Sequence, residues 1–106
     1  MTAELLILPL GEKSRGYRLV GELDISSADK LAEVLREECR QSGDVILDIS
    51  GLKFIDSSGL HVVLDACDQL RDGRLIMRNP TAPVDRVFEL AGIERVEGIR
   101  IQKSAN

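Results

Sequence analysis

The segment Asp56-Ser57-Ser58-Gly59 carries the residue types in this sequence that could do chemistry. It follows an apolar, strand-like stretch and precedes an amphipathic one, so we expect a helix to begin there. A helix N-terminus has unpaired backbone N–H groups and about half a positive charge, and both features favour a phosphate. The segment is therefore a candidate phosphate-acceptor site. A serine at this position also serves as an ordinary helix N-cap, and that alternative stays open.

A second polar turn, Gly21-Glu22-Leu23-Asp24, leads from an earlier strand into the preceding helix. In open α/β sheets, ligand and modification sites gather beyond the carboxyl ends of the strands, and both turns should lie there. We expect Asp24 to lie near Ser57 and Ser58 if the two helices begin side by side. The alternative is that Asp24 and Asp56 are ordinary turn residues.

The elements that position these turns are predicted from hydrophobic periodicity. Helices are expected from Ser26 or Ser27 to near Gly43, from Asp56 to Gly73, and from Pro83 to Gly92. Strands are expected at residues 5–8, 17–20, 45–49, 74–77 and 99–102, the first two forming an antiparallel hairpin. The apolar run 45–49 is typical of a strand covered by helices on both faces, and residues 50–55 are expected to connect it to the next helix. The order β-β-α-β-α-β-α-β predicts an α/β fold in which the later strands pair in parallel and amphipathic helices flank the sheet.

Length and composition fit one soluble domain over residues 1–106, with a disordered tail expected at 103–106. The 18 acidic and 14 basic residues give a net charge of −4, which argues against a binder of duplex nucleic acid. Only Tyr17, Phe54 and Phe88 are aromatic, so a base-stacking platform is not expected either. The chain lacks the apolar run of about 18 residues that a membrane-spanning helix needs, and its N-terminus lacks the basic start of a secretory signal.

The two cysteines, Cys39 and Cys67, form no CxxC motif and are expected to be free thiols in a reducing compartment. Cytoplasmic location is therefore the expectation. No cluster of cysteine and histidine suggests a metal site, and no glycine-rich phosphate loop precedes a Lys-Ser or Lys-Thr pair. We expect neither a metal nor a cofactor. If the serine segment accepts a phosphate from ATP, the ATP would be bound by a partner protein.

The order of the motifs is more specific than any one of them. The Gly21–Asp24 turn, an amphipathic helix, the Val45–Ile49 strand and the Phe54–Leu60 segment follow one another, and Pro80 and the Leu90–Ile93 segment come after them. In this arrangement the chain resembles the STAS family of anti-sigma factor antagonists over roughly residues 4–102.

The resemblance implies a mixed sheet with the N-terminal hairpin at its edge, and a bacterial partner-switching regulator of transcription. In that family the unphosphorylated protein binds an anti-sigma factor that is also a serine kinase, which releases the sigma factor. Phosphorylation of the first serine of the motif inactivates the antagonist, and a serine phosphatase restores it. By motif, the phosphoacceptor is Ser57, with Ser58 as second choice. The implied partner-binding residues are Glu22, Asp24, Asp56, Ser58 and Gly59. His61 stands where family members usually carry a small residue, but it lies four residues after Ser57 on the same helix face and is a further candidate, with a solvated surface histidine as the alternative. We expect a monomer with no nucleic-acid partner and no direct membrane insertion.

Two other functions compete with this one. Ser57 with His61, and Asp24 or Asp65 as an orienting acid, could imitate a hydrolase triad. Because the sequence has one histidine and no GxSxG elbow, we expect no enzyme. The other alternative is a STAS regulatory or scaffold subunit of a stressosome or of a lipid- or anion-transport complex. Control by a ligand, or by redox chemistry at Cys39 or Cys67, also stays open.

Overall fold

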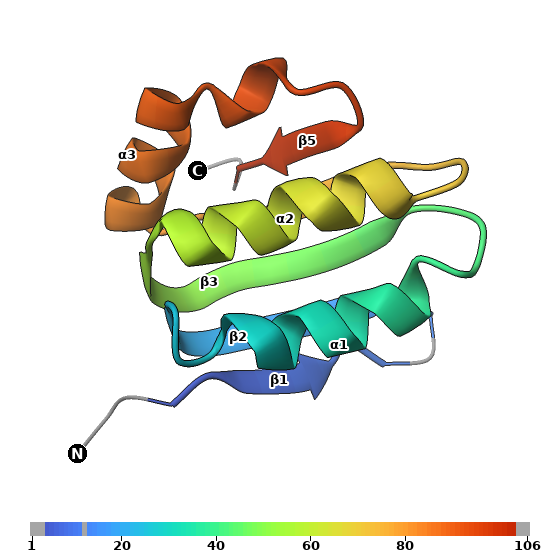
Figure 1. Ribbon diagram of the computed structural model, residues 1–106, viewed down its shortest axis with the longest axis horizontal. Coiled ribbons are helices and arrows are strands. Elements are labelled where there is room, and N and C mark those ends of the chain that lie inside the picture. The colour runs from blue at the N-terminus through green and yellow to red at the C-terminus, as the bar shows by residue number, and fades with distance from the viewer. Residues whose placement is uncertain (1–3, 12, 104–106) are drawn as a thin grey trace.

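The structure is a computed structural model that describes residues 4–11 and 13–103 (Figure 1). Five strands form one sheet in the order β1-β2-β3-β4-β5. The strands are β1 (Leu6–Pro9), β2 (Gly16–Leu23), β3 (Val45–Ile55), β4 (Leu75–Arg78) and β5 (Ile99–Gln102), and the helices are α1 (Ala28–Glu38), α2 (Ser57–Gln69), α3 (Ala82–Ala91) and the short 3-10 helix η1 (Ile93–Arg95). β1 pairs antiparallel with β2, and every other pair is parallel. The predicted element order and the edge hairpin are confirmed.

The helices cover one face of the sheet. Because the strand order follows the chain and parallel crossovers are right-handed, successive helices fall on the same side. Figure 1 shows α1 and α2 lying over β2 and β3 on that side. Val45 and Leu47 of β3 are fully buried beneath the helices, whereas Ser50, on the opposite face, is exposed. The expectation that helices cover the 45–49 strand on both faces is therefore wrong.

The opposite face of the sheet carries an ion pair between β2 and β3. Asp48 points there and lies beside Arg18 of β2, its register partner, with 3.1 Å between Arg18 Nε and Asp48 Oδ2. The amide of Ser50 also donates to Asp48 Oδ1 (3.0 Å). These contacts give hydrogen-bond partners to the Asp48 carboxylate, which is only 9% exposed on the face opposite the helices.

Strand β3 is longer than predicted. It runs to Ile55 and pairs with β2 as far as Leu23, so residues 50–55 are strand and not a connecting loop. The pairing shifts register twice along β2, between Arg18 and Val20 and between Gly21 and Glu22. Leu52 and Ile55 are buried, at 0% and 3% exposure. As a result, Asp56 follows the sheet directly and its position is fixed by strand pairing.

The ends of the helices differ from the expected ones. α1 begins at Ala28, and α1 and α2 end at Glu38 and Gln69, ahead of the glycines expected to stop them. The Arg15 guanidinium donates to the carbonyls of Glu38, Gln41 and Ser42, which binds the C-terminal end of α1 to the start of β2. Gly92 caps α3 in the left-handed conformation, as predicted.

The tail expected to be disordered begins at Lys103, whose Nζ lies 3.0 Å from Asp85 Oδ2 of α3. Residues 104–106 lie outside the described residues. None of the helices that the structure describes is both long and apolar enough to cross a membrane.

Candidate functional site

The two turns singled out in the sequence lie at the same end of the sheet. β2 and β3 are parallel and finish together, with Leu23 in register with Ile55. The amide of Asp56 donates to the carbonyl of Leu23 (3.2 Å). Each strand leads into a helix, and Figure 1 shows α1 and α2 beginning side by side. The predicted neighbourhood of the Asp24 turn and the serine pair is therefore confirmed.

Asp56 is the N-cap of α2. Its backbone is extended, and its Oδ1 accepts hydrogen bonds from the amides of Ser58 (2.9 Å) and Gly59 (3.3 Å). Ser57 and Ser58 are the first two residues of the helix, so neither serine acts as the cap. The alternative in which a serine hydroxyl is occupied by capping does not apply to this helix.

The two serines that begin α2 differ in exposure. Ser57 is exposed, whereas Ser58 is half-buried. Within the part of the chain that the structure describes, Ser57 Oγ takes part in no hydrogen bond. A group added to this oxygen would therefore extend away from the protein. The carboxylate of Asp56 already engages two of the first amides of α2, so a phosphate on Ser57 would find fewer free donors than at an uncapped helix.

Gly59 lies beneath the site and not on its surface. It is buried, and a Cβ at this position would come within 2.6 Å of Leu23 Cγ and 2.8 Å of Ile55 Cγ1. The absence of a side chain lets the first turn of α2 pack against the ends of β2 and β3. Gly59 therefore contributes to the predicted partner surface only indirectly, by fixing the positions of Ser57 and Ser58.

The Asp24 turn is held by its own side chains. Asp24 Oδ1 accepts from the amide (3.0 Å) and the hydroxyl (2.7 Å) of Ser26, and the hydroxyl bond is the main reason why the pKa of Asp24 lies below its ordinary value. Ser27 occupies the N-cap position of α1, but its hydroxyl makes no capping bond to the helix: it accepts from the amide of Asp24 (3.0 Å) and donates to the carbonyl of Glu22 (2.9 Å). These bonds fix the turn and favour the ionised form of its carboxylate.

The remaining predicted residues lie around this end or further along α2. Glu22 is half-buried in β2, in register with Phe54. His61 is exposed, and its Nε2 lies 3.8 Å from Asp65 Oδ2. No hydrogen bond joins Ser57 to His61 among the described residues, so the first contact that a hydrolase triad requires is not formed.

Two apolar residues at this end were missed by the sequence interpretation. Ile25 is 80% exposed at the tip of the Asp24 turn, and Phe54 is 47% exposed near the end of β3. Ile25 could have been noticed as an apolar residue in a polar turn, outside the periodic stripe of α1. Phe54 falls in the segment 50–55 that the sequence predicts as a connection, whereas the structure extends β3 to Ile55.

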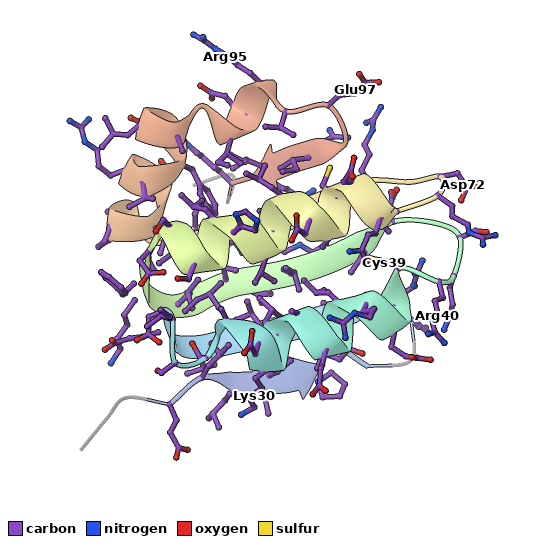
Figure 2. All side chains as sticks on the ribbon, in the orientation of Figure 1. Lys30, Cys39, Arg40, Asp72, Arg95 and Glu97 are labelled. Atoms are coloured by element: carbon purple, nitrogen blue, oxygen red, sulfur yellow. The ribbon has the colours of Figure 1, made fainter. Side chains whose placement is uncertain are left out.

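The cysteines lie at the other end of the helices. Figure 2 shows Cys39 at the C-terminal end of α1, where its Sγ contacts the carbonyl of Ala66 (3.4 Å). Cys67 Sγ contacts the carbonyl of Glu97 (3.3 Å). Burial raises the pKa of both thiols, which disfavours the reactive thiolate. Across residues 4–11 and 13–103, no three metal-ligating side chains gather into a cluster.

The chain is 30% identical over 83 residues to an anti-sigma F factor antagonist of Paenibacillus polymyxa, a match that covers 74% of this chain and 71% of the relative. Its fold is similar to that of an anti-sigma factor antagonist from Mycobacterium paratuberculosis, with a TM-score of 0.75, 16% identity, and coverage of 98% of this chain and 88% of that one. The phosphorylated form of the Bacillus cell fate determinant SpoIIAA is also similar, with a TM-score of 0.62, 22% identity, and coverage of 94% and 92%. The model of the STAS domain family matches residues 13–105, and the chain belongs to that family.

Proposed function

We propose that this protein is a cytoplasmic anti-sigma factor antagonist that is switched by phosphorylation of Ser57. The unphosphorylated form binds an anti-sigma factor that is also a serine kinase, and the sigma factor is released. Phosphorylation ends this binding, and a serine phosphatase restores it. The observation that carries the proposal is the exposed, uncommitted hydroxyl of Ser57, which follows the Asp56 cap and lies at the same end of the sheet as the Asp24 turn.

The relatives support the same role. A relative with 30% identity is named an anti-sigma F factor antagonist, and a protein of the same fold, SpoIIAA, has been solved in a phosphorylated form. Within this chain, Ser57 is favoured over Ser58 because Ser57 is exposed and Ser58 is half-buried. A kinase active site must enclose the acceptor oxygen, and the more exposed serine offers more room.

Phosphorylation should change the surface and leave the fold intact. A phosphate carries about 1.5 to 2 negative charges, and at a helix N-terminus such a charge stabilises by roughly 0.3 to 1 kcal/mol. Asp56 already occupies part of this end, so the gain should fall at the low end of that range. The inactivation is therefore a loss of docking and not a loss of structure.

The chain's own residues act as substrate and docking surface in this scheme. The partner would bind ATP and catalyse phosphoryl transfer, and the Asp24 turn would help to position Ser57 against it. The first turn of α2 is held by the Asp56 cap and by the close packing of Gly59, so the acceptor is presented in a fixed place. No catalytic role is proposed for this chain.

The test is phosphorylation by the anti-sigma factor kinase of the same organism. The purified protein is incubated with the kinase and ATP, and intact mass is measured. We expect one phosphate, which is lost in Ser57→Ala and kept in Ser58→Ala and in Ser26→Ala, the exposed serine of the neighbouring turn. A phosphate that persists in Ser57→Ala and disappears in Ser58→Ala would move the acceptor to Ser58. No modification together with no binding to the kinase would refute the proposed function.

A further inference from the structure

Two large apolar side chains are exposed at the end of the sheet that carries Ser57. Ile25 is 80% exposed and Phe54 is 47% exposed. Neither belongs to the hydrophobic core or packs against its edge. Isolated apolar residues on a surface are ordinary, so the relevant observation is that both lie at the end of the sheet that carries Ser57.

The strand pairing sets where they lie. Ile25 follows Asp24 directly, and Phe54 precedes Asp56 by two residues. Phe54 is in register with Glu22, and the next pair, Leu23 with Ile55, closes the sheet. Because side chains alternate along a strand, Phe54 points to the helix-free face while its neighbour Ile55 is buried beneath α2. The two apolar groups thus flank the acceptor end from the turn and from the sheet.

The carboxylates of Asp24 and Asp56 at this end of the sheet are compatible with an apolar partner surface. Asp24 is held by hydrogen bonds from Ser26, and Asp56 by amides of α2. Both carboxylates therefore keep internal partners when water is removed. A phosphate on Ser57 would have fewer such partners, because Asp56 already accepts from the amides of Ser58 and Gly59. A docked apolar surface would leave the phosphate poorly solvated, at a cost that the free hydroxyl does not incur.

We infer that Ile25 and Phe54 are the apolar anchors through which the unphosphorylated protein binds its anti-sigma factor, and that the partner presents an apolar surface to them. This inference rests on the proposed function. It assigns the binding energy to two side chains outside the acceptor motif. It also explains how a modification at Ser57 ends binding without altering the fold, since the phosphate lies at the same end of the sheet as both anchors.

The test measures affinity of unphosphorylated variants for the purified anti-sigma factor kinase of the same organism by titration calorimetry. Ile25→Ser and Phe54→Ser should each bind at least tenfold more weakly than the unsubstituted protein, as expected for anchor residues. Two controls match them in exposure: Leu90→Ser on α3 (74% against 80%) and Leu8→Ser on β1 (44% against 47%). Both controls should bind within about threefold of the unsubstituted protein.

The outcomes separate this inference from the function beneath it. Thermal unfolding shows that each variant is folded, and Ile25→Ser decides the question alone if Phe54→Ser does not fold. Tenfold weaker binding of folded Ile25→Ser, with Leu90→Ser unaffected, supports the inference. If the unsubstituted protein binds and is phosphorylated on Ser57, but Ile25→Ser binds equally well, the inference fails and the proposed function stands. If the unsubstituted protein does not bind, both fail.

Discussion

The amide of Asp56 donates a hydrogen bond to the carbonyl of Leu23 across 3.2 Å, and this bond joins the final residues of the β2–β3 pairing to the start of α2. It brings the segment after β3 to the turn after β2, although the two are separated in sequence by a whole helix and a strand. The Asp24 turn and the segment that begins at Asp56 can form one site only because β2 and β3 pair in parallel. The segments that carry Ser57 and Asp24 lie at the same end of the sheet because two strands end in register.

The first prediction concerns the cap. Asp56→Ala removes the side chain that accepts from the amides of Ser58 and Gly59, and should lower the free energy of unfolding by about 1 kcal/mol. Ser57→Ala removes a hydroxyl that caps nothing and should change it by less than about 0.5 kcal/mol. Urea unfolding of both variants tests this. The reverse order of the two effects would mean that a serine caps α2, and Ser57→Ala could then no longer serve as a clean probe of the acceptor oxygen.

The second prediction concerns Gly59. In Gly59→Ala the new methyl group meets Leu23 Cγ and Ile55 Cγ1, and such overpacking costs about 1 to 3 kcal/mol. Alanine regains about 1 kcal/mol of helix propensity, so we expect a net loss of roughly 1 kcal/mol. Thermal unfolding measures the change. Ser58→Ala, one residue earlier in the same turn, is the matched control and should be close to neutral. A more stable Gly59→Ala would show that the first turn of α2 can move away from the strands at little cost.

The sequence predicted the elements with regular periodicity, and missed those in which the sheet breaks that periodicity. Val45, Leu47 and Ile49 alternate as a strand should, but the next buried positions, Leu52 and Ile55, are spaced by three. The irregular pairing of β2 with β3 displaces this part of the strand. When the spacing of the apolar residues changes from two to three, the sequence pattern looks like the end of a strand. The sequence therefore predicts a connecting segment at residues 50–55.

The local preferences of residue types also explain which features of the site could be predicted from the sequence. The start of α2 and the proximity of Asp24 to the serines followed from strand order and helix periodicity, which residue types encode directly. The choice of the capping residue did not, because Asp and Ser favour the N-cap almost equally. Backbone geometry decides it, since the extended conformation of Asp56 places its carboxylate against the amides of the first turn. The place of Ile25 outside the apolar stripe of α1 is visible in the sequence, but its 80% exposure depends on how the turn packs against the rest of the chain.

The third prediction is a dependence of stability on pH. Burial alone would raise the pKa of Asp48, but hydrogen bonds from Ser50 and the Arg18 guanidinium outweigh it and hold that pKa below the ordinary value. Between this lowered pKa and the ordinary value of about 4, the unfolded chain binds more protons than the folded one. The contribution of Asp48 is therefore complete above that window and is lost as the pH falls through it.

Asp48→Asn tests this dependence. It should be less stable than the unsubstituted protein by about 1 kcal/mol at neutral pH, because a charge-assisted hydrogen bond is replaced by a neutral one. The difference should shrink as the pH is lowered from 7 toward 3, as measured by urea unfolding at each pH. Asp68→Asn, which changes an exposed carboxylate on α2, is the control for the general effect of charge. A constant difference between Asp48→Asn and the unsubstituted protein over this range would contradict the assignment.

The fourth prediction distinguishes two ways in which a phosphate on Ser57 could end binding. Repulsion between exposed charges is screened by salt, because the Debye length falls from about 10 Å at 0.1 M to about 3 Å at 1 M. The cost of removing water from a phosphate is not screened in this way. Since Ile25 and Phe54 flank the acceptor end and Asp56 occupies amides that a phosphate would use, we expect desolvation to dominate. The ratio of the Kd of the phosphorylated protein to that of the unphosphorylated protein should therefore change by less than about threefold between these two salt concentrations. A ratio that falls close to one at high salt would show that charge repulsion alone operates the switch. Ser57→Asp, whose carboxylate carries less negative charge than a phosphate, should then recover binding at a lower salt concentration than the phosphorylated protein.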